Sequence, residues 1–170
     1  MTRILYPLVA ALALCVLPDC KKIPVESHYP SEGDSLPEFS ITLQNGLKLG
    51  KNELSGGILL LTFFNTSCPD CRNELPEIQK CLESLSETEG VRIVAVSREE
   101  GAESVGKYWK DNGLTIPYSA QEDRKVYSLF ASSGIPLTIV ARNGVITHIH
   151  NCYSTFEASD ILNEIYSLSL

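Results

Sequence analysis

The chain has 170 residues, of which 44% are hydrophobic, and its formal net charge is −7. This length and apolar content suffice to bury one core, which predicts a single folded domain. The acidic balance and the thinly spread lysines and arginines exclude a basic stripe, so we expect no nucleic-acid partner.

The first 19 residues have the features of an export signal peptide. Arg3 precedes an apolar stretch over residues 4–17, which is shorter than the roughly 20 residues that a membrane-spanning helix needs. The segment Leu17-Pro18-Asp19-Cys20 resembles a bacterial lipobox, although Asp19 stands where a small residue is usual. Cys20 is the expected lipidation site because polar sequence follows it directly. Cys15 is the competing candidate, and an ordinary secreted protein or an uncleaved anchor is the remaining alternative.

Residues 20–35 are polar and contain Pro24, Pro30 and Gly33, so we interpret them as a tether before a domain that spans residues 36–170. At the start of that domain, residues 39–43 alternate between apolar and polar side chains. Asn45-Gly46 is a turn signal, and residues 47–49 return as a second short strand. This pattern predicts an N-terminal β-hairpin.

The rest of the chain alternates between strand and helix patterns. The nearly unbroken apolar run over residues 58–64 predicts a central strand that is buried on both faces. Apolar spacings of three and four predict a helix over residues 69–86. The further expected elements are strands at 91–96 and 115–119, helices at 102–112 and 123–132, and a hairpin of 137–141 with 145–150. A closing helix is expected from Ser154 or Thr155, with Glu157 as a capping-box partner of Ser154. This order predicts an α/β fold with a mixed central sheet and helices on both faces.

The pair Cys68 and Cys71 lies where the central strand gives way to a helix. Thiols at this spacing can interconvert between a dithiol and a disulfide, and a helix N-terminus stabilises the reactive thiolate. Pro69 suits the first helical turn, where its missing N–H is not needed. The alternative is half of a four-cysteine zinc site, but no second Cys-x-x-Cys pair or well-spaced histidine pair completes one. We therefore expect no metal.

Three segments resemble the thioredoxin superfamily, specifically envelope-anchored thiol-disulfide oxidoreductases of the TlpA type. They are residues 33–39 (GDSLPEF), 61–76 (LTFFNTSCPDCRNELP) and 133–136 (SGIP). The resemblance implies a thioredoxin-like domain that reduces protein disulfides in the bacterial cell envelope. It also implies that the Cys68–Cys71 disulfide serves as the redox centre without any other cofactor. Phe64 and Ser67 depart from the two tryptophans usual in the family, and Thr62 stands where thioredoxins carry a buried aspartate.

The resemblance also implies roles for the residues around the pair. Cys68 would attack the substrate, and Cys71 would resolve the mixed disulfide. Glu74 would assist proton transfer from a poorly solvated position, the alternative being an exposed surface acid. Pro136 would be cis and would place the backbone of Ile135 beside the disulfide to bind an extended substrate, the alternative being a plain proline at a strand start.

Two substrate-contacting positions between the cysteines are expected to set the redox poise. Pro69 and Asp70 follow the attacking thiol directly. We expect the negative charge of Asp70 to disfavour the thiolate, which favours a reducing pair. The alternative is that Asp70 is a solvated acid at a helix start. The expected partners are protein thiols or disulfides, an upstream electron donor in the envelope, and a membrane reached through the lipid anchor.

Other functions remain open from the sequence. A thiol peroxidase of the redoxin group would want a threonine where Asn65 stands. A Cu(I)-binding or heme-ligation accessory protein would use the cysteines with His148 and His150, although copper-delivery relatives use a longer cysteine spacing. Cys81 is expected to be a small buried hydrophobe. A bridge from Cys81 to Cys152 is a further alternative.

Overall fold

The computed structural model describes residues 30–169. The predicted signal peptide, most of the predicted tether and both lipidation candidates, Cys15 and Cys20, lie outside the described residues. Within residues 30–169, none of the helices has the length and apolar character needed to cross a membrane.

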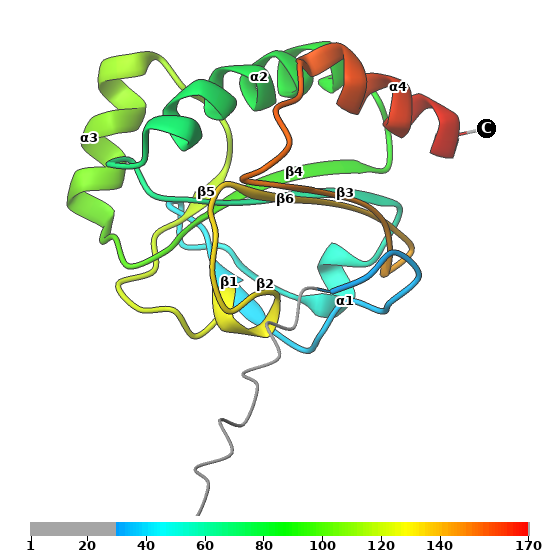
Figure 1. Ribbon diagram of the computed structural model, residues 1–170, viewed down its shortest axis with the longest axis horizontal. Helices are drawn as coiled ribbons and strands as arrows, with labels where there is room; N and C mark the ends of the chain where they lie inside the picture. Colours follow the sequence, from blue (N-terminus) through cyan, green and yellow to red (C-terminus); the bar gives the residue numbers. More distant parts are fainter. Residues whose placement is uncertain (1–29, 170) are drawn as a thin grey trace, which may run out of the picture.

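One mixed sheet of five strands forms the centre of the fold, in the order β5-β4-β3-β6-β7 (Figure 1). Its strands are β3 (Ile58–Phe64), β4 (Val91–Ser97), β5 (Tyr118–Ser119), β6 (Leu137–Arg142) and β7 (Val145–Asn151). Strands β3, β4 and β5 run parallel, β6 is antiparallel to β3, and β7 is antiparallel to β6. The mixed sheet predicted from the element order is therefore confirmed.

Helices cover one face of this sheet, and a hairpin with two short helical segments covers the other (Figure 1). The upper layer in Figure 1 consists of α2 (Pro69–Leu85), α3 (Ala102–Asn112) and α4 (Ala158–Ser169). The lower layer consists of the predicted hairpin of β1 (Ser40–Thr42) and β2 (Lys48–Gly50), the helix α1 (Lys51–Leu54) and the 3₁₀ turn η1 (Tyr127–Leu129). The short α1 is not anticipated by any pattern in the sequence.

Strand β3 is buried along its whole length and contributes side chains to the cores on both faces of the sheet. Leu59, Leu61 and Phe63 belong to the core beneath the sheet, whereas Leu60 and Phe64 belong to the core under the helices. Alternate side chains of a strand point to opposite faces, so a strand between two layers is apolar at nearly every position. This confirms the expectation of burial on both faces.

The prediction of a helix over residues 123–132 is wrong. Only the single 3₁₀ turn η1 forms there, although Val126, Tyr127 and Phe130 are buried with a helix-like spacing. The Tyr127 hydroxyl donates a hydrogen bond to the carbonyl oxygen of Gly134 at 2.6 Å. This bond ties the turn to the loop before β6, so tertiary contacts outweigh the local helical pattern.

The predicted start of the closing helix is also wrong, because α4 begins at Ala158. Ser154 does not form a capping box with Glu157. Its hydroxyl bonds instead to the backbone of Asn151, and the Asp160 carboxylate accepts the Glu157 N–H. The loop between β7 and α4 is thereby longer than predicted, which brings its residues to the site described below.

Two boundaries differ from the sequence interpretation. β5 is shortened to Tyr118–Ser119, since Pro117 has no N–H to donate to a sheet. At the N-terminal side, Gly33 N–H donates to the carbonyl of Ile146, and Leu36 N–H donates to that of Gly144, both at 2.8 Å. The predicted boundary at residue 36 therefore falls inside a segment that is already paired with the β6–β7 hairpin.

Candidate functional site

Strand β3 and helix α2 present the two motif cysteines at different depths. Cys68 is the N-cap residue of α2 and is partly exposed, whereas Cys71, within the first turn, is fully buried. Pro69 occupies the start of the helix, as predicted. One thiol is therefore accessible at the surface while the other is shielded behind it, and Cys68 lies close enough to raise the pKa of the Cys71 thiol.

The loop that carries Cys68 is held by hydrogen bonds that involve the side chains of Glu100, Arg72 and Asn65. The Glu100 carboxylate accepts hydrogen bonds from the N–H and the hydroxyl of Thr66. Arg72 Nε donates to the carbonyl of Thr66 at 2.5 Å. Asn65 Oδ1 accepts the N–H of Ser67 at 2.9 Å, which forms an Asx turn just before the cysteine. Glu100 lies 34 residues away in the chain, so no local signal could have identified it.

The peptide bond between Ile135 and Pro136 is cis, as the sequence predicts. This bond lies beside the first thiol, and Cys68 Sγ is 3.7 Å from the carbonyl oxygen of Ile135. The backbone of Ile135 is thus placed where an extended chain that approached Cys68 would meet it.

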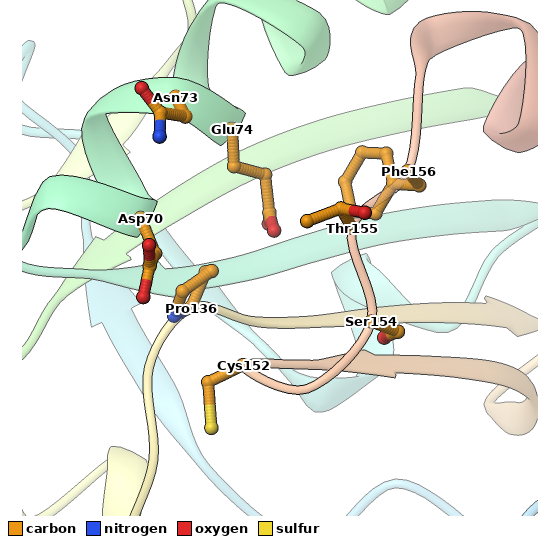
Figure 2. A pocket seen from close by; sticks show the side chains of 8 residues that line it. All are labelled: Asp70, Asn73, Glu74, Pro136, Cys152, Ser154, Thr155 and Phe156. Carbon is orange, nitrogen blue, oxygen red and sulfur yellow. The ribbon is translucent and has the colours of Figure 1, made fainter.

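A cavity of about 140 Å³ opens next to these residues (Figure 2). Asp70, Glu74 and Pro136, all predicted from the sequence, line one part of it. The other lining residues were not predicted: Asn73 on α2 and Cys152, Ser154, Thr155 and Phe156 from the loop between β7 and α4. The four loop residues lie between the end of β7 at Asn151 and the start of α4 at Ala158.

Glu74 is the buried carboxyl of the site, with only 9% of its surface exposed. This contradicts the alternative of a surface acid. Burial raises the pKa of Glu74 to about 7 because the charged form loses its hydration, while hydrogen bonds from Thr138 and Thr62 act in the opposite direction. A carboxyl with such a pKa can both accept and release a proton near neutral pH.

Cys71 is held in its protonated form. Burial raises the pKa of the Cys71 thiol far above its ordinary value, and the neighbouring Cys68 and Glu74 add to this shift. Cys71 therefore needs a base before it can act as a nucleophile. Glu74 lies one helical turn further along α2, on the same side of the helix.

The other two described cysteines are separate thiols and do not form the bridge considered above. Cys81 is fully buried, as expected, and its Sγ lies 3.6 Å from the carbonyl oxygen of Ala158. Burial raises the pKa of Cys81 to about 12, which makes it unreactive. Cys152 is partly exposed and lines the cavity.

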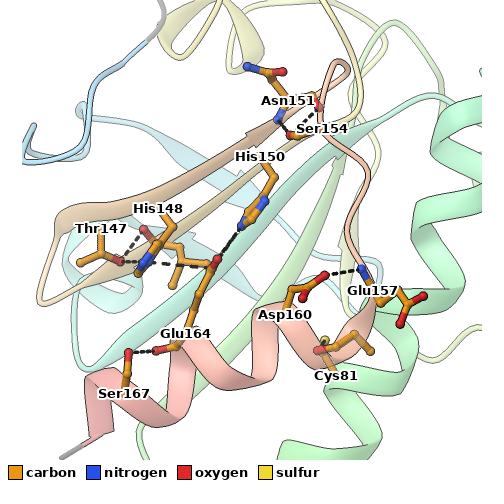
Figure 3. A network of polar contacts seen from close by, with 12 residues as sticks. Cys81, Thr147, His148, His150, Asn151, Ser154, Glu157, Asp160, Glu164 and Ser167 are labelled. Atoms are coloured by element: carbon orange, nitrogen blue, oxygen red, sulfur yellow. Dashed lines mark hydrogen bonds and ion pairs between the residues drawn. The ribbon is translucent and has the colours of Figure 1, made fainter.

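The two histidines of β7 face α4 (Figure 3). His150 Nε2 lies 3.1 Å from the Glu164 carboxylate, and His148 Nδ1 lies 3.8 Å from it. His150 also packs its ring against Phe156, with 4.9 Å between centroids. Among residues 30–169, no group of three or more histidine, cysteine, aspartate or glutamate side chains is arranged to hold a metal ion.

Comparisons with solved structures show the fold. The chain is similar to a thioredoxin-family thiol:disulfide interchange protein from Chlorobium tepidum TLS, with a TM-score of 0.69, 20% identity, and coverage of 82% of this chain and 98% of that one. It is equally similar to the thioredoxin domain of a thiol-disulfide oxidoreductase from Bacteroides vulgatus, with a TM-score of 0.69, 20% identity, and coverage of 81% and 97%. The predicted thioredoxin-like fold is therefore confirmed.

Comparisons with curated proteins show sequence relatives. Thiol-disulfide oxidoreductase ResA of Bacillus subtilis (strain 168) is 30% identical over 110 residues, which cover 65% of this chain and 61% of the relative. ResA of Oceanobacillus iheyensis is 28% identical over 155 residues, which cover 87% and 78%. The chain thus spans less than two thirds of the length of the Bacillus subtilis relative.

A family model described as the AhpC/TSA family matches residues 33–149. This range contains the hairpin, the Cys-x-x-Cys helix and the cis-proline loop. Because the match covers well over half of a chain with a thioredoxin-like fold, the chain belongs to the AhpC/TSA family.

Proposed function

We propose that the chain is a protein thiol-disulfide oxidoreductase that works through Cys68 and Cys71, and that it reduces protein disulfides. The observation that carries this proposal is the pairing of a partly exposed thiol at the start of α2 with a buried thiol behind it. The similarity to proteins named thiol-disulfide oxidoreductase ResA supports it.

The reaction would proceed in two exchanges. The Cys68 thiolate attacks a substrate disulfide, forms a mixed disulfide and releases one substrate thiolate. Cys71 then gives its proton to the Glu74 carboxylate and attacks Cys68 Sγ. This closes the Cys68–Cys71 disulfide and releases the second substrate thiolate, which takes up a proton. Two electrons pass from the protein to the substrate, and a thiol donor must restore the dithiol.

The substrate would lie along the loop before β6. The Ile135 carbonyl beside Cys68 offers a backbone acceptor to an extended segment, and cis-Pro136 shapes that edge of the cavity. Pro69 and Asp70 would contact the substrate at the start of α2. The negative charge of Asp70 beside the pair would favour its acting as a reductant.

We also propose an envelope location for the mature protein. The sequence features of residues 1–19 and the lipobox-like segment at Cys20 support export and lipid anchoring to a membrane. Exported proteins meet oxidising conditions, in which disulfides persist. A dithiol that acts there as a reductant would need an upstream electron donor in the envelope, and it would need no cofactor besides its own disulfide.

Trapping of substrates tests the function. Cys71→Ser removes the resolving thiol, so mixed disulfides on Cys68 should accumulate in cells and appear as higher-mass bands that reductant removes. Cys152→Ser is the matched control, because it removes a nearby thiol that lines the cavity and that the proposal does not use. It should accumulate none of these species.

Two outcomes would contradict the proposal. One is the absence of mixed disulfides with Cys71→Ser, and the other is an equal yield when Cys68 is also replaced by serine. Consumption of hydrogen peroxide by Cys71→Ser, which keeps Cys68, would instead support the thiol peroxidase alternative.

A further inference from the structure

Two buried threonines contact Glu74 from positions where the surrounding pattern is apolar. Thr62 on β3 and Thr138 on β6 are direct partners in the antiparallel register, and they are 1% and 0% exposed. Their neighbours on the same face of the sheet are Leu60, Phe64 and Val140, which belong to the core under the helices. A buried hydroxyl in such surroundings is unfavourable unless it forms hydrogen bonds, so the partners of these two groups are informative.

The hydroxyls form a chain that ends on the Glu74 carboxylate. Thr138 Oγ1 lies 2.7 Å from Thr62 Oγ1 and 2.5 Å from Glu74 Oε1, whereas Thr62 Oγ1 lies 3.4 Å from Oε1. Each hydroxyl has one proton to donate. The two short contacts are both satisfied when Thr62 donates to Thr138 and Thr138 donates to Oε1. The carboxylate is then held from below by a directed pair of donors.

This arrangement leaves the second carboxylate oxygen for the cavity. Within residues 30–169, Glu74 Oε2 has no hydrogen-bond partner, and Figure 2 shows the carboxyl directed into the cavity between Pro136 and Thr155. The titratable groups that face Glu74 are Cys71 and Asp70 on its own helix and Cys152 on the loop between β7 and α4. β3 and β6 contribute the two threonine hydroxyls.

We propose that Thr62 and Thr138 are positioning residues that hold Glu74 as the base for Cys71. This inference rests on the function proposed above and assigns the groups that prepare its second exchange. Hydrogen bonds from the threonine chain favour the carboxylate, fix Oε1 and turn Oε2 toward the cavity. The proton then moves from Cys71 Sγ to the carboxylate, and the Cys71 thiolate attacks the mixed disulfide.

Removal of the donor should shift the pH dependence of the second exchange. In Thr138→Val the carboxylate loses the hydrogen bond that favours its charged form, so the pKa of Glu74 rises further. We expect the pH at which the second exchange is half-maximal to rise by roughly one unit, which lowers its rate about fivefold at pH 7. Thr138→Ser keeps the hydroxyl and should restore the original profile. Thr62→Val should shift the profile in the same direction by less.

The two exchanges can be resolved with an aromatic disulfide, dithiobis-nitrobenzoate, whose released thiolate is coloured. Attack by Cys68 releases the first coloured thiolate, and attack by Cys71 on the mixed disulfide releases the second. The measurement uses the full chain in detergent, with Cys15→Ser, Cys20→Ser and Cys152→Ser, so that the signal comes from the motif. Stopped-flow traces between pH 5 and 9 then give a pH profile for each step.

The outcomes separate this inference from the proposed function. The positioning role is supported if Thr138→Val raises the pH at which the second exchange is half-maximal, and if this rise disappears when Glu74→Gln is also present. If Glu74→Gln abolishes the inflection of the second step but Thr138→Val leaves it at the original pH, the positioning role is overturned and the function stands. If Glu74→Gln leaves the profile unchanged, the proton-transfer role of Glu74 in the proposed function fails. Should Thr138→Val not fold, an unshifted profile in Thr62→Val overturns the inference.

Discussion

Glu74 should make the stability of the reduced protein depend on pH in a direction unusual for a carboxyl. Its folded-state pKa of about 7 lies above the ordinary value of 4.5 because the side chain is buried. Between these two values the folded state therefore binds more protons than the unfolded state. Under this condition the free energy of unfolding falls as pH rises. Glu74→Gln removes the titrating group while it keeps the size of the side chain.

The size of this change in the free energy of unfolding follows from the difference between the two pKa values. A rise from 4.5 to about 7 is roughly 2.5 pH units, and each unit corresponds to about 1.4 kcal/mol, so the full effect is about 3 kcal/mol. The stabilising contribution of protonated Glu74 is complete below pH 4.5 and is lost as pH rises through 7. Stability relative to Glu74→Gln should fall by this amount across the window.

Urea unfolding of the reduced proteins at a series of pH values between 4.5 and 8 measures the effect. The comparison of wild type with Glu74→Gln removes the contributions of other titrating groups, including His148 and His150, which are common to both proteins. Parallel stability curves across the window would refute the reasoning, since they would mean that Glu74 titrates alike in the folded and unfolded states.

Two further predictions concern the scaffold, and urea unfolding checks both. Gly57→Ala should lower the free energy of unfolding by more than about 2 kcal/mol, because φ is +85° and a Cβ there would lie 2.2 Å from the Gly90 carbonyl oxygen. Gly56→Ala is its matched control, with open space at the Cβ position, and equal losses in both variants would contradict the steric argument. Trp109→Phe should lower stability by about 1–2 kcal/mol, because the buried Ile116 carbonyl loses the 2.8 Å hydrogen bond from Nε1. An unchanged urea midpoint would count against this.

Prediction from the sequence succeeds where the signal is local and fails where partners are distant. The nearly unbroken apolar run identifies the fully buried β3, and the Cys-x-x-Cys spacing places one thiol at the N-cap of α2 and the other inside it. The helical spacing near Tyr127 is equally regular, yet only η1 forms there, because the bond to Gly134 fixes the segment. The Glu100 contact to Thr66 and the position of Cys152 beside Glu74 have no local signature.

The amino-acid order by itself determined the mixed α/β architecture and the redox pair, because periodicity, turn residues and cysteine spacing act over a few neighbouring positions. Only the tertiary structure decided the chemistry available to that pair. Glu74 becomes a base near neutral pH through burial against β3 and β6, and its hydroxyl partners, Thr62 and Thr138, are 76 positions apart along the chain. Desolvation and hydrogen bonding depend on which surfaces meet, and these arise only when the sheet forms beneath α2.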